Sequence, residues 1–492
     1  MSQKKHQGTH RAPRSARRRR TTTISIAAIA ACALCAACFY GNRFGLRPGL
    51  SPSAGAVATV PGAPAAAKTV AAKSLVGEAA DRPTPINQSV IDQALKTFES
   101  NPSLGTDNSV LVENSDGKIL ASLDPTVPRT PASNLKTLTA LAVVHTLNMG
   151  STLATDTYLV SRSGSAGTVV LKGHGDMLLG TGYNDPDHVV GRAGLVSLAQ
   201  ETAAVLKARR ITSVTLDIDN SLFGSETTPP TMIPGIEAMG DYTPMSSMAI
   251  DEGKIGSLGS NPDDIKNAYL PRQTDPAGAV SAVFAQLLDK DGITVSPQRG
   301  TASAVQMKAE TAGNQLGVIH SAPLWEILRL TLQQSDNTLI ELLGRLLALK
   351  VGAANSTAGA TSSIVKIDSD LGIDMNGVHM ADCSGLSNGS TATVAALVQV
   401  ERQYYESANA DALEGLGVAG FSGTAQEHDF APDIYGLARL KTGTLGNVTA
   451  QSGTVLPLKG GLLYFSVIVN NPTSEAGAEQ AIDNFVSALA NA

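Results

Sequence analysis

Three short polar motifs, widely separated along the chain, constrain its fold more than any other feature. They are Ser133-Asn134-Leu135-Lys136 (S-x-x-K), Ser335-Asp336-Asn337 (S-D-N) and Lys441-Thr442-Gly443, which Thr444 follows. The first two serines are 202 residues apart, and 106 residues separate Ser335 from Lys441. Each motif alone is weak, since Ser2 and Lys5 also form S-x-x-K. Their joint occurrence in this order predicts a fold that brings the three together.

The first motif opens a predicted helix over residues 131–145, directly after a predicted hairpin. Residues three apart on a helix share one face, so the amine of Lys136 can reach the hydroxyl of Ser133. A serine hydroxyl is a poor nucleophile until a base takes its proton. A partly desolvated Lys136, close to a second lysine at Lys441, would have a lowered pKa and could act as that base. The motif therefore predicts an acylated nucleophile at Ser133.

The second motif lies in a break between two predicted helices, within residues 323–349. Ser335 is placed to relay a proton to a leaving amine, with Lys441 polarising its hydroxyl. Asn337 can donate a hydrogen bond to a backbone carbonyl of the substrate. These residue types complete the chemistry of acyl transfer that the first motif begins.

The third motif leads into a predicted C-terminal hairpin. The strand edge at 441–444 can pair with an extended substrate. Gly443 has no side chain, so the substrate can lie close to the strand. Thr442, together with Lys441, suits a free terminal carboxylate, and the backbone N–H groups of Ser133 and Thr444 can form an oxyanion hole.

The N-terminus carries an export pattern. Residues 1–20 hold 8 positive charges and no acid, whereas the rest of the 492-residue chain has a net charge of −14. The run 24–40 has 17 residues and no charge. A basic flank before an apolar run is typical of a signal sequence or a retained membrane anchor. We therefore expect an acidic body outside the cytoplasm, either secreted or tethered to the membrane by 24–40, and no binding to nucleic acid.

The remaining sequence predicts an α+β protein whose first and last parts form one domain. The middle part differs, because short β-like runs there alternate with Gly- and Pro-rich loops. Hairpins are expected at 109–122 and 448–470, and helices at 194–208, 276–288 and 474–489. The predicted organisation is a basic cytoplasmic tail (1–20), a signal or anchor segment (21–40), a Pro/Ala-rich linker (41–85), a catalytic domain in two parts (86–151 and 309–492), and an inserted, mainly β lobe (152–308).

With these motifs the sequence resembles the class C low-molecular-weight penicillin-binding proteins, the D-alanyl-D-alanine carboxypeptidase/endopeptidase family. The resemblance covers about residues 85–490. Three further segments support it: Gly173–Gly180 (GHGDMLLG), Asp382–Ser387 (DCSGLS) and Lys441–Ala450 (KTGTLGNVTA). Two features depart from the family pattern, because Cys383 stands where glycine is usual and no proline follows Asp176. Both concern local substrate contacts and leave the nucleophile untouched.

The resemblance implies a penicillin-binding/β-lactamase-like transpeptidase fold, an α/β sandwich with the large lobe inserted between the first and second motifs. It implies a serine D,D-peptidase that acts on peptidoglycan peptides through an acyl-enzyme, needs no cofactor, and is inhibited covalently by β-lactam antibiotics. In the family, an acidic residue of the lobe helps to bind the diaminopimelate side chain. Asp219, in the segment DIDNSLF, is the matching candidate. Carboxypeptidase and endopeptidase activity, and the diamino acid itself, stay open at this point.

Two other functions are alternatives to a D,D-peptidase. A class A β-lactamase needs a glutamate soon after S-D-N to activate the deacylating water, and between Thr338 and Met380 the sequence offers Glu341 alone. A catalytically silent cell-wall sensor with the same fold would be expected to lose a serine or lysine of the motifs, and this sequence keeps them all.

No metal site is expected from the sequence. His174 and Asp176 lie close together, but no second histidine pair stands at metal-ligand spacing. The remaining histidines of the body, His428 among them, are scattered, and no G-x-S-x-G elbow appears around a serine.

Overall fold

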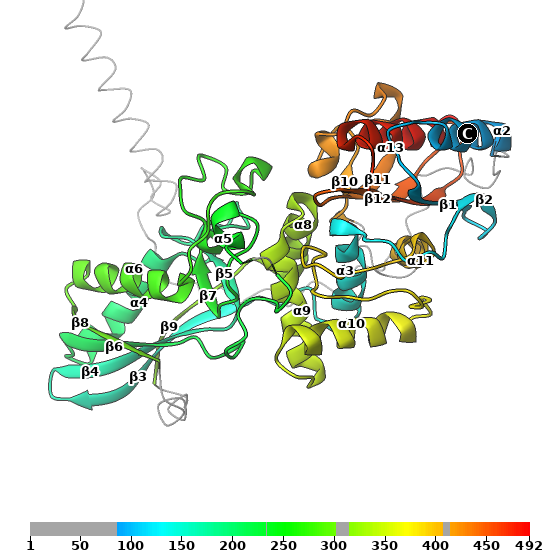
Figure 1. Cartoon of the computed structure of the whole chain (residues 1–492). Coiled ribbons are helices and arrows are strands. Elements are labelled where there is room, and N and C mark those ends of the chain that lie inside the picture. Colours follow the sequence, from blue (N-terminus) through cyan, green and yellow to red (C-terminus); the bar gives the residue numbers. More distant parts are fainter. Residues whose placement is uncertain (1–85, 233, 302–313, 407–413) are drawn as a thin grey trace, which may run out of the picture. The chain divides into compact units, whose positions relative to one another are not determined.

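The computed structural model describes residues 86–492 except 233, 302–313 and 407–413 (Figure 1). The chain divides into two compact units, 1–75 and 76–492, and every described residue belongs to the second. The predicted basic tail and the segment 24–40 therefore lie outside the described residues. Within the described ranges, none of the helices has the length and apolar character that crossing a membrane requires.

A six-stranded antiparallel sheet joins the two ends of the folded unit. Its strand order is β10-β11-β12-β13-β1-β2. The strands are β1 (Asp107–Asn114), β2 (Ile119–Leu123), β10 (Gly417–Val418), β11 (Ala438–Thr444), β12 (Val448–Val455) and β13 (Leu463–Asn470). The predicted N-terminal and C-terminal hairpins become neighbours because β1 pairs with β13 along its whole length. The first and last parts of the chain thus form one domain.

Helices cover both faces of this sheet. On one face α2 (Gln88–Glu99) packs beside α13 (Glu475–Leu489), with the rings of Phe98 and Phe485 5.6 Å apart. The helices of the other side are α3 (Leu135–Thr146), α8 (Leu324–Gln334), α9 (Asn337–Val351), α10 (Thr357–Asp370) and α11 (Val394–Glu406). This layered arrangement is the predicted α/β sandwich, and the fold class is confirmed.

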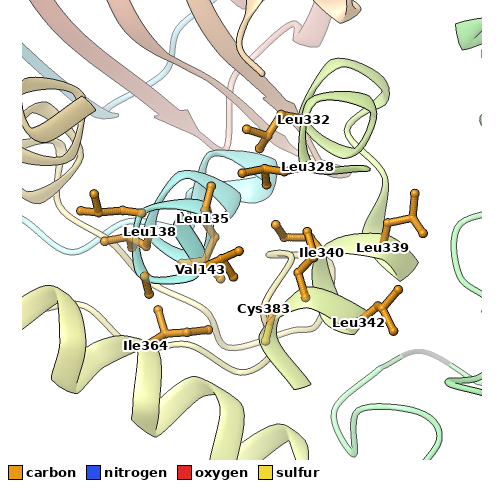
Figure 2. Packing of buried hydrophobic residues seen from close by; sticks show 14 of the residues in the cluster. Leu135, Leu138, Val143, Leu328, Leu332, Leu339, Ile340, Leu342, Ile364 and Cys383 are labelled. Carbon is orange, nitrogen blue, oxygen red and sulfur yellow. The ribbon is translucent and has the colours of Figure 1, made fainter. Parts of the chain in front are cut away.

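Helix α3 is the centre of the main core. Residues 135–143 are all buried, so the helix lacks the polar face of a surface helix. Leucines and isoleucines from α8, α9 and α10 surround it, as Figure 2 shows. Cys383 also enters this core. A Cβ atom at Gly344 of α9 would lie 2.4 Å from the Cys383 sulfur, so the glycine makes room for the thiol.

A second sheet forms the lobe. Its order is β8-β6-β4-β3-β9, with β3 (Ala154–Ser163), β4 (Ala166–Gly173), β6 (Ser213–Asp219), β8 (Thr294–Thr301) and β9 (Gln315–His320). Strands β4, β6 and β8 run parallel and are joined through α4 (Leu195–Ala208) and α6 (Pro276–Lys290), as parallel strands require. Strand β9 pairs with β3 although it follows the predicted lobe boundary at 308.

The rest of the lobe carries short elements that reach toward the helical layer. Strands β5 (Asp176–Leu179) and β7 (Met248–Ile250) pair in parallel, and α5 (Ile236–Met239) precedes β7. Short 3-10 turns complete the described structure: η2 (Ala132–Asn134), η3 (Asp251–Gly253), η4 (Ile265–Asn267), η5 (Thr424–Gln426) and η6 (Pro432–Ile434).

Candidate active site

Ser133 stands at the start of the buried helix α3, in the turn η2. The residue before it, Ala132, has a positive φ of 47°. That backbone conformation is unfavourable for a non-glycine residue and is typical of functional sites held by their surroundings. Ser133 lines a pocket of about 510 Å³. The sequence folds this way locally because the apolar helix α3 begins directly after this turn, which fixes the serine at the boundary between core and pocket.

Lys136 lies beneath the pocket, wholly buried, with its amine directed at the first two motifs. Its Nζ donates to Ser133 Oγ at 2.8 Å, to Asn337 Oδ1 at 2.7 Å and to the carbonyl of Ser384 at 3.0 Å. Burial lowers its pKa to about 8, against the opposing charges of nearby aspartates. A lysine with this pKa is neutral in about a tenth of the molecules at pH 7, and the neutral form can accept the proton of the serine hydroxyl.

The second motif occupies the junction between α8 and α9. Ser335 ends α8 in the left-handed conformation, with φ at 56°. Asp336 caps α9, accepting a hydrogen bond from Leu339 N at 2.8 Å. The sharp turn aims the Ser335 hydroxyl at the third motif, where Lys441 Nζ donates to it at 2.9 Å. Burial and the charge of Lys136 together hold the pKa of Lys441 well below its ordinary value.

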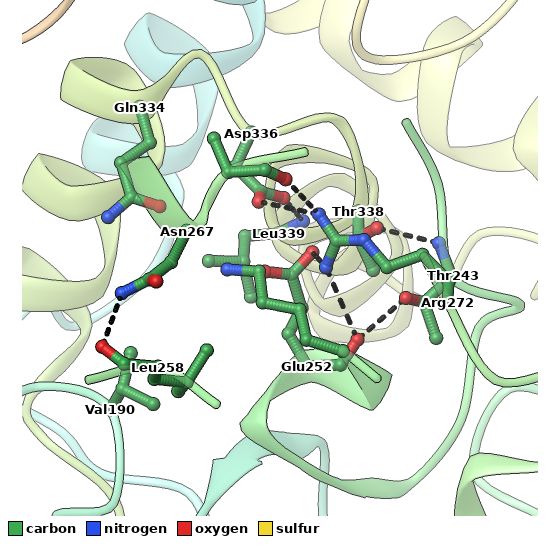
Figure 3. Close-up of polar contacts among 12 residues, drawn as sticks. Val190, Thr243, Glu252, Leu258, Asn267, Arg272, Gln334, Asp336, Thr338 and Leu339 are labelled. Atoms are coloured by element: carbon green, nitrogen blue, oxygen red, sulfur yellow. Dashed lines mark hydrogen bonds and ion pairs between the residues drawn. The ribbon is translucent and has the colours of Figure 1, made fainter. Parts of the chain in front are cut away.

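The lobe braces this junction, as Figure 3 shows. Thr243 N donates to Thr338 Oγ1 at 2.9 Å, and Asn337 Nδ2 donates to the carbonyl of Asp241 at 3.0 Å. Arg272 lies 2.8 Å from a carboxylate oxygen of Glu252 and 3.9 Å from one of Asp336, and all three side chains are buried.

In these contacts between the lobe and the second motif, the buried acidic side chains lie beside basic ones. Burial alone would raise the pKa of Glu252, but Arg272 and Lys254 lower it to about 2, so this carboxylate stays ionised. Burial and the charge of Glu252 raise the pKa of Asp336 to about 7. The lobe therefore holds the second motif in place through buried, charge-paired contacts as well as backbone hydrogen bonds.

The third motif is a strand edge beside the nucleophile. The neighbouring strand β10 pairs only with Arg439 and Leu440, so within the described structure no strand covers the edge from Lys441 onward. A Cβ atom at Gly443 would lie 3.0 Å from the backbone nitrogen of Ser133. Only glycine lets the strand come this close to the turn that carries the nucleophile.

The pocket gathers most of the predicted site residues. Ser133, Ser335, Asn337, Thr442 and Thr444 line it, while Lys136 and Lys441 are buried next to it. Gly385, Leu386, Leu445 and Gly446 also line it, and they belong to the segments 382–387 and 441–450. The other lining residues had no motif to mark them: Met239, Asp241, Tyr269, Thr424, Glu427, His428 and Glu479. Three of them come from the lobe and meet the motifs only through the fold.

Asp219 lies apart from the residues that line the pocket. It ends β6 as a buried side chain, with Ser221 Oγ donating to one carboxylate oxygen at 2.6 Å and Lys172 Nζ lying 3.4 Å from the other. The segment that follows is held against α9, where Arg345 donates to the carbonyl of Phe223 at 2.8 Å. The expected contact of Asp219 with a substrate side chain stays a prediction.

Glu341 is the glutamate on which the β-lactamase alternative depends. It belongs to α9, and its side chain is buried. Its carboxylate accepts hydrogen bonds from Cys383 N at 3.0 Å and from the hydroxyl of Thr357 at 3.3 Å. Burial and the charge of Asp382 raise its pKa to about 7. The side chain does not line the pocket, so it is not placed to activate a water for deacylation. Of the pair His174 and Asp176, the histidine lies 2.8 Å from Asp156, and Asp176 is buried.

The site combines a serine at a helix start, a buried lysine beneath it and a second serine polarised by another lysine. These features define an enzyme that transfers acyl groups through a nucleophilic serine, with an accessible strand edge for its substrate. Comparison with known proteins gives the family. The sequence matches the D-Ala-D-Ala carboxypeptidase 3 (S13) family over residues 91–261 and 256–492. The chain belongs to this family, and it is a serine-type D-Ala-D-Ala carboxypeptidase.

Individual relatives agree with this assignment. Carboxypeptidase DacB of Mycolicibacterium smegmatis is 30% identical over 420 residues, covering 83% of this chain and 85% of that protein. The D-alanyl-D-alanine carboxypeptidase of an Actinomadura species is 29% identical over 230 residues, 45% of this chain and 42% of that protein. The solved penicillin binding protein 4 of Haemophilus influenzae shares the fold, with a TM-score of 0.63 and 19% identity over 81% of this chain and 99% of that chain.

Proposed function

We propose that the enzyme cleaves peptidoglycan stem peptides through an acyl-enzyme on Ser133. The hydroxyl oxygen bonds to the carbonyl carbon of the penultimate D-alanine while its proton passes to neutral Lys136. The C–N bond then breaks, and the departing amine receives the proton that Lys136 took, relayed by Ser335. Water next attacks the ester carbonyl and gives a proton to Lys136, the bond between the carbonyl carbon and the serine oxygen breaks, and Lys136 returns that proton to the serine oxygen. The contact that carries this proposal is the 2.8 Å hydrogen bond between Lys136 and Ser133.

Substrate binding follows from the other groups of the pocket. The edge of β11 from Lys441 to Thr444 offers backbone groups to an extended peptide, and the N–H groups of Ser133 and Thr444 can stabilise the oxyanion. Thr442 lines the pocket, and its hydroxyl suits the terminal carboxylate. β-Lactams carry the same carboxylate beside an acylating carbonyl, and the Haemophilus influenzae penicillin binding protein 4 has been solved with one bound. We therefore expect slow-turnover acylation by penicillin.

The proposed substrate also suggests where the enzyme acts. The substrate lies outside the cytoplasm, and residues 1–40 carry the pattern of an export signal or anchor. We infer that residues 86–492 act in the cell wall space. Protease added to intact spheroplasts is expected to digest them, and full protection would reject this topology.

Digestion of purified muropeptides tests the activity directly. Wild-type enzyme is expected to release D-alanine from pentapeptides, and the cross-linked dimers in the same digest measure endopeptidase activity. The Ser133→Ala variant should release neither product, because it lacks the hydroxyl that forms the acyl-enzyme. Release of D-alanine by a correctly folded Ser133→Ala variant would contradict the proposal. Chromatography with mass detection separates the two activities in one experiment.

A further inference from the structure

One wall of the pocket carries a histidine that the mechanism above does not use. The His428 ring is stacked on Phe430, with centroids 5.6 Å apart, and Nδ1 lies 2.9 Å from Asp483 Oδ1 on α13. Within the described structure, every hydrogen bond and ion pair of His428 runs through Nδ1. Since His428 lines the pocket, the ring nitrogen Nε2 is the one available to a bound substrate.

Strand register places this histidine on the same side of the sheet as Thr442 of the third motif. Gln451 of β12 lies directly opposite Thr442 of β11, and opposed residues of antiparallel strands share a face of the sheet. The Gln451 amide donates to Asp483 at 2.6 Å and lies 3.1 Å from His428 Nδ1. The hydroxyls of Thr424 and Thr442 are 2.6 Å apart on this wall. Two hydroxyls and one imidazole thus line the same side of the pocket.

Acidic groups surround the imidazole. Asp483 and Glu479 approach it from α13, and Glu427 precedes it in its own loop and lines the pocket. Burial alone would lower the pKa of His428. The hydrogen bond that the ring donates to Asp483 and the charges of Asp483 and Glu479 nevertheless raise that pKa above its ordinary value, against the opposing charge of Lys441 on β11. The wall therefore presents an imidazolium cation at lower pH and, once the ring loses its proton, only acidic side chains.

We propose that His428, as an imidazolium, binds the terminal carboxylate of the substrate together with the hydroxyls of Thr424 and Thr442, and that it makes carboxylate recognition dependent on pH. This proposal rests on the proposed peptidase function. A hydrogen bond between two ionised groups is roughly twice as strong as one between neutral groups. The carboxylates of Asp483 and Glu479 keep the ring protonated, and without that proton they would repel the substrate.

The sign of the pH effect separates this role from that of the base. Binding is strongest below the pKa of His428, and KM for a carboxylate substrate rises as the pH passes through that pKa. Lys136 acts in the opposite sense, because it must lose its proton, with a pKa of about 8, to serve as base. Raising the pH is thus expected to increase kcat and to increase KM at the same time.

Steady-state kinetics on a matched pair of peptides tests the proposal. One synthetic peptide ends in D-Ala-D-Ala with a free carboxylate, and the other is its C-terminal amide. At pH 6 the His428→Gln variant is expected to raise KM for the acid about tenfold, as loss of one charge-assisted contact implies. Its KM for the amide and its kcat on both peptides should stay within about twofold of wild type. The KM of the variant for the acid should also lose its rise with pH.

Glu479→Gln is the second variant, on the half-exposed rim of the same wall. Removing this charge should shift the rise of KM for the acid to lower pH, and this profile alone decides the matter if His428→Gln fails to fold. Equal losses on the acid and the amide, or profiles unchanged in both variants, would overturn the carboxylate role of His428. If wild-type enzyme cleaves neither peptide, the peptidase function itself is wrong and not merely this inference.

Discussion

Gly443 is the residue whose identity the structure explains most sharply. A methyl group there would meet the Asn134 amide at 2.8 Å and the Ser133 backbone nitrogen at 3.0 Å. The strand would have to move away from the nucleophile, and a displacement of about 1 Å at a reacting centre can cost on the order of 100-fold in rate. Gly443→Ala is therefore expected to slow acylation by a fluorescent penicillin about 100-fold, with little change in melting temperature.

Gly182→Ala is the matched control for that experiment, because a Cβ atom at Gly182 meets nothing within 4 Å. This control should be acylated at the wild-type rate. If Gly443→Ala reacts as fast as the control, the close approach of strand and nucleophile is not needed for catalysis.

The sequence alone identified the site residues that belong to a motif, and it missed the site residues that do not. Ser133, Ser335 and Lys441 stand in recognisable spacings, and the structure brings them together. Asp241 and His428 have no such local signature. Asp241 reaches Asn337 from 96 residues away, through its backbone carbonyl, which any residue type could supply. Such contacts depend on the tertiary fold and leave no pattern in a single sequence.

Elements were predictable where local chemistry decides them. The turn at Asn114–Gly117 and the Lys459-Gly460-Gly461 turn marked the two hairpins, which the structure contains as β1–β2 and β12–β13. The interruption at Ser335 was also visible, because S-D-N places a good helix N-cap, Asp336, inside an apolar helical run. The pairing of β1 with β13 follows from the global topology, not from any local signal.

The lobe shows the same limit among elements. Its two long helices were expected from caps and periodicity, and they are α4 and α6. The parallel arrangement of β4, β6 and β8 was not foreseen from short apolar runs, because periodicity does not reveal strand direction. Strand β9 returns to pair with β3 after a segment outside the described residues, which sequence texture alone could not place.

At the scale of the whole molecule, the inserted lobe must let the first and second motifs meet, and it also supports the second motif. The first and second motifs are separated by the lobe yet meet at one pocket, so the lobe leaves and re-enters the catalytic domain close to the same place. The family resemblance led us to expect a lobe that helps to bind the diaminopimelate side chain of the substrate. The structure adds a bracing role, since Thr243 and Arg272 contact the helix junction that carries Ser335. The lobe therefore helps to hold the pocket of the catalytic domain in shape.

The central claim is that Ser133 alone becomes acylated. Intact-mass analysis after exposure to benzylpenicillin, followed by peptide mapping, tests it most directly. The wild-type protein should gain one penicillin adduct, located on the peptide that contains Ser133. The Ser133→Ala variant should gain none while keeping its melting temperature, and Ser89→Ala, at an exposed serine of α2, should label like wild type. An adduct on folded Ser133→Ala, or a wild-type adduct mapped to another residue, would contradict the account.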